Sequence, residues 1–349
     1  MPWTPLQIGD VTLAHRVVLA PLTRGRATIS TIHSRTSVPN DLMKVYYTER
    51  ATPGGLLISE ATPVSVRASG FPGVPGTFTE EQQEAWRPIV GGVHAKGSVF
   101  FAQLWHQGRN THSSVIGQQP ESASAVPMDG SVMWSGVEPL PFEAPKAMSK
   151  EDIAATQRDF VNAARNAREI GFDGVEIHAG NGYLFDQFHH SNINQRTDEY
   201  GGSIENRCRF TLETVDQISA AIGSARLGVR LSPFGLFNQT HGEKRMEQWT
   251  YLCNELSKRN VAYVHMIEPR FDEFKGASEK ALALSEMSLD QDISLAPFRK
   301  ALGKTPLMSA GGFGPDNYEE GIGKRGPGGE TEEQGTALQM GQDQILWTV

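Results

Sequence analysis

Short apolar runs recur along the chain, and most are followed by a stretch with helical periodicity. The runs are apolar throughout instead of alternating, as expected for parallel strands covered on both faces. They span residues 16–22, 56–62, 99–105, 174–180, 227–233, 262–269 and 306–312. Repeated strand-then-helix units predict an α/β fold of the (β/α)₈ TIM-barrel class, with its site at the C-terminal ends of the strands.

Two further elements fit this architecture. A helix is predicted to begin after Ser149, whose hydroxyl can cap it, with Asp152 three residues on. Residues 6–8 and 11–13 flank Gly9-Asp10 and predict a β-hairpin that could close the bottom of the barrel. No linker or second domain is indicated, so we expect residues 1–349 to form a single domain.

Composition narrows the class of partner. The 349 residues suit one barrel, and a hydrophobic content of 38% is enough for a large core. A formal net charge of -8 argues against nucleic acid or an anionic membrane as the main partner. Cys208 and Cys253 follow no metal or disulfide pattern, and we see neither a signal peptide nor a membrane-spanning run. We therefore expect a cytoplasmic protein.

The segment 174–183 carries the most chemistry, because a short apolar strand leads directly into a polar loop. His178 and Asn181 can each donate a hydrogen bond, and Tyr183 carries a phenol that is protonated near neutral pH. Two donors and a weak acid can polarise a carbonyl and protonate the carbon beside it. The alternative is a strand end with a capping histidine and a surface tyrosine.

Other strand ends carry polar or glycine residues that have structural alternatives. Thr23 could simply satisfy a turn. Gln103 could pair with a heterocycle or be a satisfied core amide. Arg230 lies inside an apolar strand, where it is costly unless an anion, a polar ligand or a buried ion pair meets it. Gly311-Gly312 could expose N–H groups to a phosphate or merely form a turn.

Several segments together resemble the Old Yellow Enzyme family of FMN-dependent ene-reductases. The resemblance covers roughly the first 315 residues, and the motifs are specific in combination and in order. They are residues 16–27 (RVVLAPLTRGRA), 55–62 (GLLISEAT), 103–105 (QLW), 171–183, 196–207 (RTDEYGGSIENR) and 263–270 (YVHMIEPR).

The resemblance implies FMN bound across the mouth of the barrel and NADPH as the reductant, with ping-pong hydride transfer to an α,β-unsaturated aldehyde or ketone. It implies that His178 and Asn181 bind the substrate carbonyl oxygen and that Tyr183 donates the proton. It implies that the flavin phosphate is served by Gly311 and Gly312. The implied flavin-ring contacts are Pro21, Leu22, Thr23, Ala61, Gln103 and Arg230.

The C-terminal segment 321–349 departs from the family. Residues 321–335 are rich in glycine and charge, and the candidate eighth strand is 336–341 (TALQMG), with Gln342 where the family has a phosphate-binding arginine. We therefore expect the eighth βα unit to be degenerate or incomplete. This departure keeps two alternatives open: a family-derived isomerase or cyclase without net redox chemistry, and a non-catalytic scaffold that has lost FMN.

A metal-dependent hydrolase is a poor alternative, and no metal is expected. The chain has no H-E-x-x-H motif, and His189 and His190 are adjacent on an expected loop. Residues 106–148 form a long segment rich in proline, serine and glycine, which we expect to cover the pocket and to decide which small-molecule enone or enal fits. The sequence specifies neither that substrate nor an oligomeric state.

Overall fold

Eight parallel strands form a closed barrel in the computed structural model, which describes residues 3–269, 271, 279–280, 283–284, 293–313 and 345–348. The predicted fold class is confirmed. Around the barrel the strands run β3 (Val17–Leu19), β6 (Leu56–Pro63), β7 (Val99–Trp105), β12 (Gly174–His178), β13 (Leu227–Leu231), β14 (Tyr263–Ile267), β15 (Leu307–Ala310) and β16 (Ile345–Thr348).

The strand that closes the barrel differs from the predicted one. Strand β16 pairs with β15 through Leu307↔Ile345 and with β3 through Trp347↔Val17. The sequence analysis was therefore wrong to take 336–341 as the only candidate for the eighth strand. Residues 336–341 and Gln342 lie outside the described residues. The two open edges of β3 and β15 select their partner by backbone pairing, which a local pattern does not reveal.

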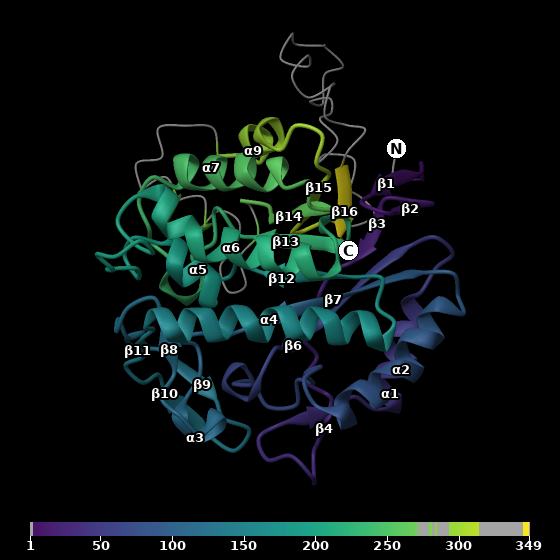
Figure 1. The fold of residues 1–349 in the computed structure, drawn as a ribbon, viewed down its shortest axis with the longest axis horizontal. Helices are drawn as coiled ribbons and strands as arrows, with labels where there is room; N and C mark the ends of the chain where they lie inside the picture. Colours follow the sequence, from purple (N-terminus) through teal and green to yellow (C-terminus); the bar gives the residue numbers. More distant parts are fainter. Residues whose placement is uncertain are drawn as a thin grey trace.

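Helices cover the outside of the barrel (Figure 1). Helix α4 contacts β7 and β12, and α1 packs against α2. The predicted start of α4 is confirmed, because Ser149 and Asp152 form a reciprocal capping box. The helices are α1 (Asp41–Arg50), α2 (Glu80–His94), α3 (Ser113–Ile116), α4 (Lys150–Ile170), α5 (Leu184–His189), α6 (Ile204–Ile222), α7 (Arg245–Lys258) and α9 (Ala296–Ala301).

The predicted N-terminal hairpin is confirmed as β1 (Leu6–Ile8) paired with β2 (Val11–Leu13). Its buried Leu6, Ile8 and Leu13 belong to the same apolar cluster as barrel residues of β3, β6, β7 and β14. The turn approaches the barrel closely, since a Cβ on Gly9 would lie 1.7 Å from the carbonyl oxygen of Ala225. The hairpin therefore closes the N-terminal end of the barrel and leaves the opposite end for a site.

The segment between β7 and α4 contains short elements of its own. It contains α3, the antiparallel pair β9 (Val132–Trp134) and β10 (Pro139–Pro141), and the parallel pair β8 (Glu121–Ser122) and β11 (Lys146–Ala147). The remaining short strands, β4 (Thr28–Ile29) and β5 (Ser37–Val38), form another antiparallel pair.

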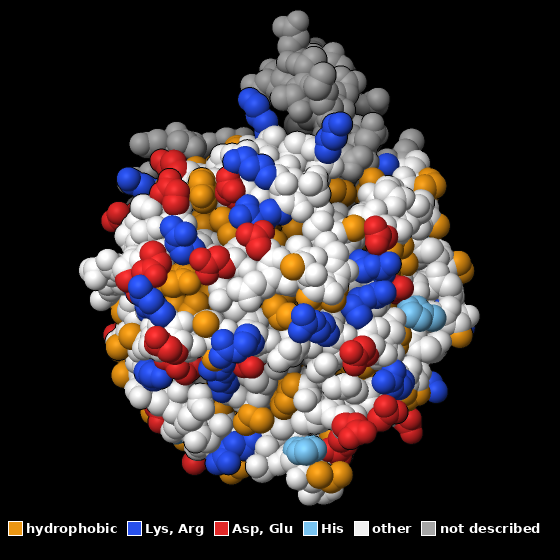
Figure 2. Space-filling view, in the orientation of Figure 1, with side chains coloured by type: hydrophobic (Ala, Val, Ile, Leu, Met, Phe, Trp, Pro, Cys, Tyr) orange, Lys and Arg blue, Asp and Glu red, His pale blue; other side chains and the backbone are white. Residues whose placement is uncertain are grey.

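The surface shows no single-sign field on the face seen in Figure 2, where acidic and basic side chains are interspersed. Within the described part of the chain, no helix is long and apolar enough to cross a membrane.

Candidate active site

The loop after β12 brings the predicted donors together through an unusual backbone path. His178 ends the strand, and the next turn places Asn181 at φ 57° and Gly182 at φ 71°. Asparagine and glycine are the residues that tolerate this left-handed region best. Tyr183 then precedes the first turn of α5. The five residues 179–183 therefore carry the chain from the end of the strand to a short helix.

Hydrogen bonds from three directions hold this turn. The carboxylate of Asp186 accepts from the backbone N–H of Gly182 at 2.9 Å and from the hydroxyl of Ser232 at 3.2 Å. The same hydroxyl oxygen accepts from the N–H of Asn181 at 2.6 Å. The amide of Asn238 donates to the carbonyl oxygen of Asn181 at 2.8 Å. Groups on α5 and in the segment after β13 therefore fix the conformation at Asn181.

Two side chains of the predicted triad are in contact, and the third has an amide that is free of hydrogen bonds with the described residues. The rings of His178 and Tyr183 meet edge to face with centroids 5.0 Å apart, and Tyr183 meets Trp105 in the same way at 4.9 Å. The side-chain amide of Asn181 makes no hydrogen bond with any residue in the described ranges. His178 Nδ1 is likewise buried without a partner there. Both groups are thus available to a ligand.

His178 is a neutral donor in this environment. Burial, followed by the positive charge of Arg230, holds the pKa of His178 well below its usual value. A neutral imidazole presents one N–H and one lone pair, so it can donate a hydrogen bond without carrying charge.

The histidine pair after the triad is not in a loop, contrary to expectation. His189 ends α5, His190 caps it, and both are buried. Their rings approach the Asp186 carboxylate at 3.5 and 3.4 Å. Burial outweighs the opposing effect of Asp186 and lowers the pKa of His190 to about 4, so the His190 ring is neutral. The loop prediction failed because neither residue breaks a helix.

The strand-borne residues predicted to contact a flavin lie at the same end of the barrel. Gln103 on β7 pairs in register with Ala61 on β6 and with Glu176 on β12. Arg230 on β13 pairs with His178. Pro21, Leu22 and Thr23 directly follow β3, while Gly311 and Gly312 follow β15 with φ of 122° and 73°.

Glu176 is a charged residue at the site that the sequence analysis missed. It is fully buried, accepts a hydrogen bond from Gln103 Nε2 at 2.7 Å and lies 3.0 Å from His265 Nδ1. Its position two residues before His178 puts both side chains on one face of β12. The sequence did contain a signal for Glu176, namely a carboxylate inside an apolar strand two positions before the candidate substrate-binding residue His178.

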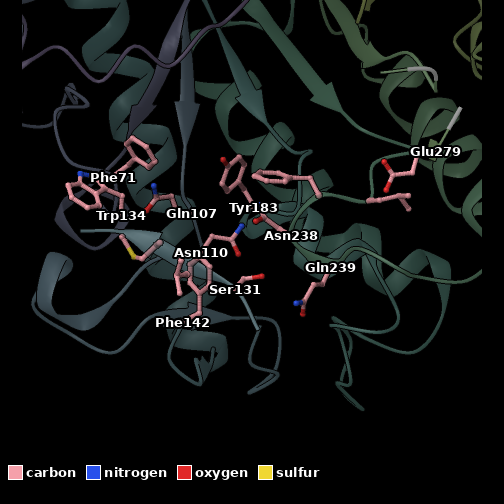
Figure 3. A pocket seen from close by; sticks show the side chains of 14 residues that line it. Phe71, Gln107, Asn110, Ser131, Trp134, Phe142, Tyr183, Asn238, Gln239 and Glu279 are labelled. Carbon is pink, nitrogen blue, oxygen red and sulfur yellow. The ribbon is translucent and has the colours of Figure 1, made fainter. Parts of the chain in front are cut away.

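A cavity of about 630 Å³ opens beside the triad (Figure 3). Tyr183 contributes to its wall, together with Phe71, Trp134 and Phe142. Gln107, Asn110 and residues 131–134 also line it, which confirms that the segment after β7 covers the pocket. His178, Gln103 and Arg230 do not line this outer chamber. They lie on the barrel strands β12, β7 and β13.

The residues present fit a polar, planar cofactor. Trp105 Nε1 and His178 Nδ1 are buried with no partner in the described part of the chain. Gln103 Oε1 also receives no hydrogen bond from any described residue. Clustered unsatisfied polar atoms are rare in folded proteins unless a ligand or water meets them. The two left-handed glycines after β15 supply the backbone curvature of an anion cradle.

Comparison with known proteins agrees with this geometry. The chain matches the NADH:flavin oxidoreductase / NADH oxidase family over residues 3–328. It is 45% identical to flavin oxidoreductase hxnT of Emericella nidulans over 325 residues, covering 91% of this chain and 83% of that protein. It is 44% identical to 12-oxophytodienoate reductase 2 of Arabidopsis thaliana over 323 residues, covering 92% and 81%.

Solved structures lead to the same group. The old yellow enzyme homologue from Zymomonas mobilis superposes with a TM-score of 0.83 at 35% identity, covering 99% of this chain and 88% of the other. Morphinone reductase in complex with tetrahydroNAD superposes with a TM-score of 0.80 at 33% identity, covering 100% and 86%. The chain therefore belongs to the NADH:flavin oxidoreductase / NADH oxidase family, the Old Yellow Enzyme family, and is an FMN-dependent oxidoreductase.

Proposed function

We propose that this protein uses NADPH to reduce the C=C bond of α,β-unsaturated aldehydes or ketones. The observation that carries the proposal is the contact between the His178 and Tyr183 rings, with an Asn181 amide on the same loop that bonds to none of the described residues. Relatives named 12-oxophytodienoate reductases support an enone as the class of substrate, since that name denotes an oxo group and two double bonds.

FMN would be held by residues from several strands. We assign contacts with its ring system to Pro21, Leu22, Thr23, Ala61, Gln103 and Arg230, and contacts with its phosphate to Gly311 and Gly312. When bound, FMN supplies the hydride chemistry, taking a hydride from NADPH and passing one to the substrate's β-carbon. The residues of the chain perform the remaining steps.

His178 and Asn181 hold the carbonyl oxygen of the substrate. Both are neutral donors, so they stabilise negative charge that develops on the oxygen as the double bond is reduced. Fixed donors in a site that excludes water need little reorganisation, and losing one typically costs 10²–10³ in rate in comparable sites. The hydrogen bonds of Asp186 and Ser232 to this loop keep the Asn181 backbone in place.

Tyr183 delivers the proton to the α-carbon. Its phenol borders the cavity, and its ring is fixed between those of His178 and Trp105. One cavity beside one triad means that NADPH and the enone bind in turn, which requires ping-pong kinetics. The family-derived isomerase and the scaffold remain distinguishable outcomes of the test below.

Both cysteines, Cys208 and Cys253, are buried and unpaired. Unpaired thiols support our placement of the protein in a reducing cytosol.

The direct test begins with an FMN titration of the purified protein, followed by anaerobic NADPH and then by turnover of cyclohexenone. We expect bound flavin absorbance, its bleaching by NADPH and its return when the enone is added. A protein that stays colourless at micromolar FMN would instead support the scaffold. Flavin that NADPH does not bleach would favour the isomerase.

Tyr183→Phe separates the two half-reactions. We expect reduction by NADPH to stay within about twofold of wild type, while reoxidation by cyclohexenone slows by about 10²-fold, in the range typical of a lost general acid. Stopped-flow absorbance follows both steps, and Tyr251→Phe on α7 serves as the matched control. Equal slowing of both half-reactions would contradict the assignment.

A further inference from the structure

The interior of the barrel contains a carboxylate that the mechanism above does not use. Glu176 is 0% exposed, and its two oxygens are engaged separately. One accepts from Gln103 Nε2 at 2.7 Å, and the other lies 3.0 Å from His265 Nδ1. An ionised carboxylate sequestered from water costs several kcal/mol unless charge and hydrogen bonds compensate it. The groups around Glu176 must therefore compensate the cost of burying its charge.

Those neighbours keep Glu176 ionised. Burial by itself raises the pKa of this carboxyl, but His265, Arg230 and Gln103 together outweigh it, and the pKa ends below its ordinary value. The pKa of His265 is below its ordinary value. Burial, followed by the positive charge of Arg230, lowers it by more than the Glu176 carboxylate raises it, so the imidazole is neutral. The group is thus one negative charge at Glu176 and one positive charge at Arg230, surrounded by neutral polar side chains.

An ionised carboxylate also fixes which way the Gln103 amide points. A carboxylate only accepts hydrogen bonds, so the nitrogen of the amide, and not its oxygen, must face Glu176. The Gln103 oxygen is left without a donor among the described residues. If Glu176 were neutral or absent, the amide could rotate, and its donor and acceptor would exchange places.

We propose that Glu176 is a positioning residue of the flavin site, which orients the Gln103 amide toward FMN and offsets the positive charge of Arg230. The proposal rests on the function proposed above, because it takes Gln103 and Arg230 as flavin contacts. Two separate properties follow. The hydrogen bond to Gln103 governs FMN affinity, and the negative charge governs the redox potential of bound FMN.

The sign of the redox effect can be derived. Two-electron reduction increases the negative charge on the flavin, so a negative charge nearby disfavours the reduced form. Removing the Glu176 charge should therefore make the potential more positive. A tenfold gain in preference for reduced over oxidised FMN corresponds to about 30 mV for a two-electron couple. A residue with only a packing role would weaken both redox states equally and leave the potential unchanged.

The experiment compares FMN dissociation constants, by fluorescence titration, and midpoint potentials, by anaerobic dye-coupled titration, in full-length variants. Glu176→Gln keeps the size of the side chain and removes its charge. We expect its dissociation constant to rise at least about tenfold and its potential to shift positive by about 30 mV or more. The matched control is Glu121→Gln, a buried carboxylate near Arg67 that should change neither quantity.

Two further variants separate the hydrogen bond from the charge. Glu176→Asp retains the charge but shortens the reach, so affinity should fall with the potential unchanged. In a Gln103→Ala background, Glu176→Gln should alter affinity less than twofold while still shifting the potential. Glu176→Asp also provides the test if Glu176→Gln does not fold, since an unchanged dissociation constant there would overturn the role in orientation.

The outcomes distinguish this inference from the function on which it rests. A wild-type protein that does not bind FMN defeats the proposed function. A wild-type protein that binds FMN, with a Glu176→Gln variant of unchanged or more negative potential, overturns the inference alone. An affinity loss that persists undiminished in the Gln103→Ala background overturns it as well.

Discussion

Removing the Asp186 carboxylate should loosen the loop that carries His178, Asn181 and Tyr183. Asp186 is fully buried and accepts from the Gly182 N–H at 2.9 Å and from the Ser232 hydroxyl at 3.2 Å. Its pKa lies below the ordinary range, because His190 and the other hydrogen bonds outweigh the effect of burial, so the group is ionised at neutral pH. Asp186→Ala would leave both donors buried without an acceptor.

The magnitude follows from those two bonds. Hydrogen bonds to a charged group contribute roughly 1.5–3 kcal/mol each, so losing both should lower the free energy of unfolding by about 3–6 kcal/mol. Asp186→Asn keeps one carbonyl oxygen that can still accept from Gly182, and we expect about half that loss. The surface residue Asp216, which pairs with Arg259 at 2.7 Å, is a matched control. Its replacement by alanine should cost no more than about 1 kcal/mol, as for other exposed pairs.

Urea denaturation at fixed FMN concentration measures the loss. Titration with a phenol, which mimics the enolate that His178 and Asn181 would hold, reports on the loop. The phenol should bind Asp186→Ala at least about tenfold more weakly than wild type, because the donors of His178 and Asn181 lose their fixed spacing. A variant that loses less than about 1 kcal/mol and binds the phenol normally would show that the loop is held by other contacts.

Two further substitutions test separate features. Burial raises the pKa of Glu60 from an ordinary value of 4.5 to about 7 in the folded protein. The contribution of Glu60 to the free energy of unfolding is therefore fully present at low pH and is lost as pH rises through 7. Glu60→Gln should therefore gain stability over wild type between pH 5 and 8, by on the order of 3 kcal/mol in urea melts, and a gain independent of pH would refute it. Gly182→Ala should weaken phenol binding, because its Cβ would lie 2.6 Å from that of Asn238; Gly202→Ala, at a similar φ with open space around it, should leave binding unchanged.

The barrel could be predicted because its strands are continuous apolar runs. Strand β7 has the predicted bounds of 99–105 and β6 extends one residue beyond the predicted 56–62, while the other predicted strands are shortened by a few residues. The eighth strand could not be placed in this way. Ile345–Thr348 is short and follows a long polar stretch, and what makes it a strand is pairing with β15 and β3, more than 30 residues away. Such pairing leaves no local mark in the sequence.

In the candidate site too, residues close together in the sequence were predicted, and a residue with a distant partner was not. His178, Asn181 and Tyr183 occupy one short segment, so their combination is visible in the sequence before any folding. Asp186 was not singled out, because its role in holding the loop depends on a hydrogen bond from Ser232, which lies 46 residues further on. The structure alone reveals that a residue on α5 holds the backbone of the loop before it.

Glu176 shows why a polar residue in an apolar strand should be interpreted with its partners. By itself it has the same signature as Arg230, a charge in a run that otherwise enters a core. A lone buried carboxylate would be strongly destabilising, and Arg230 on the neighbouring strand is one of the groups that lower the pKa of Glu176. Their strands bring them into one barrel interior, where Gln103 and His265 complete the set. A fully buried carboxylate is costly to fold, and a ligand beside it would explain why Glu176 is there. The redox potential of that ligand is the property that its charge would control.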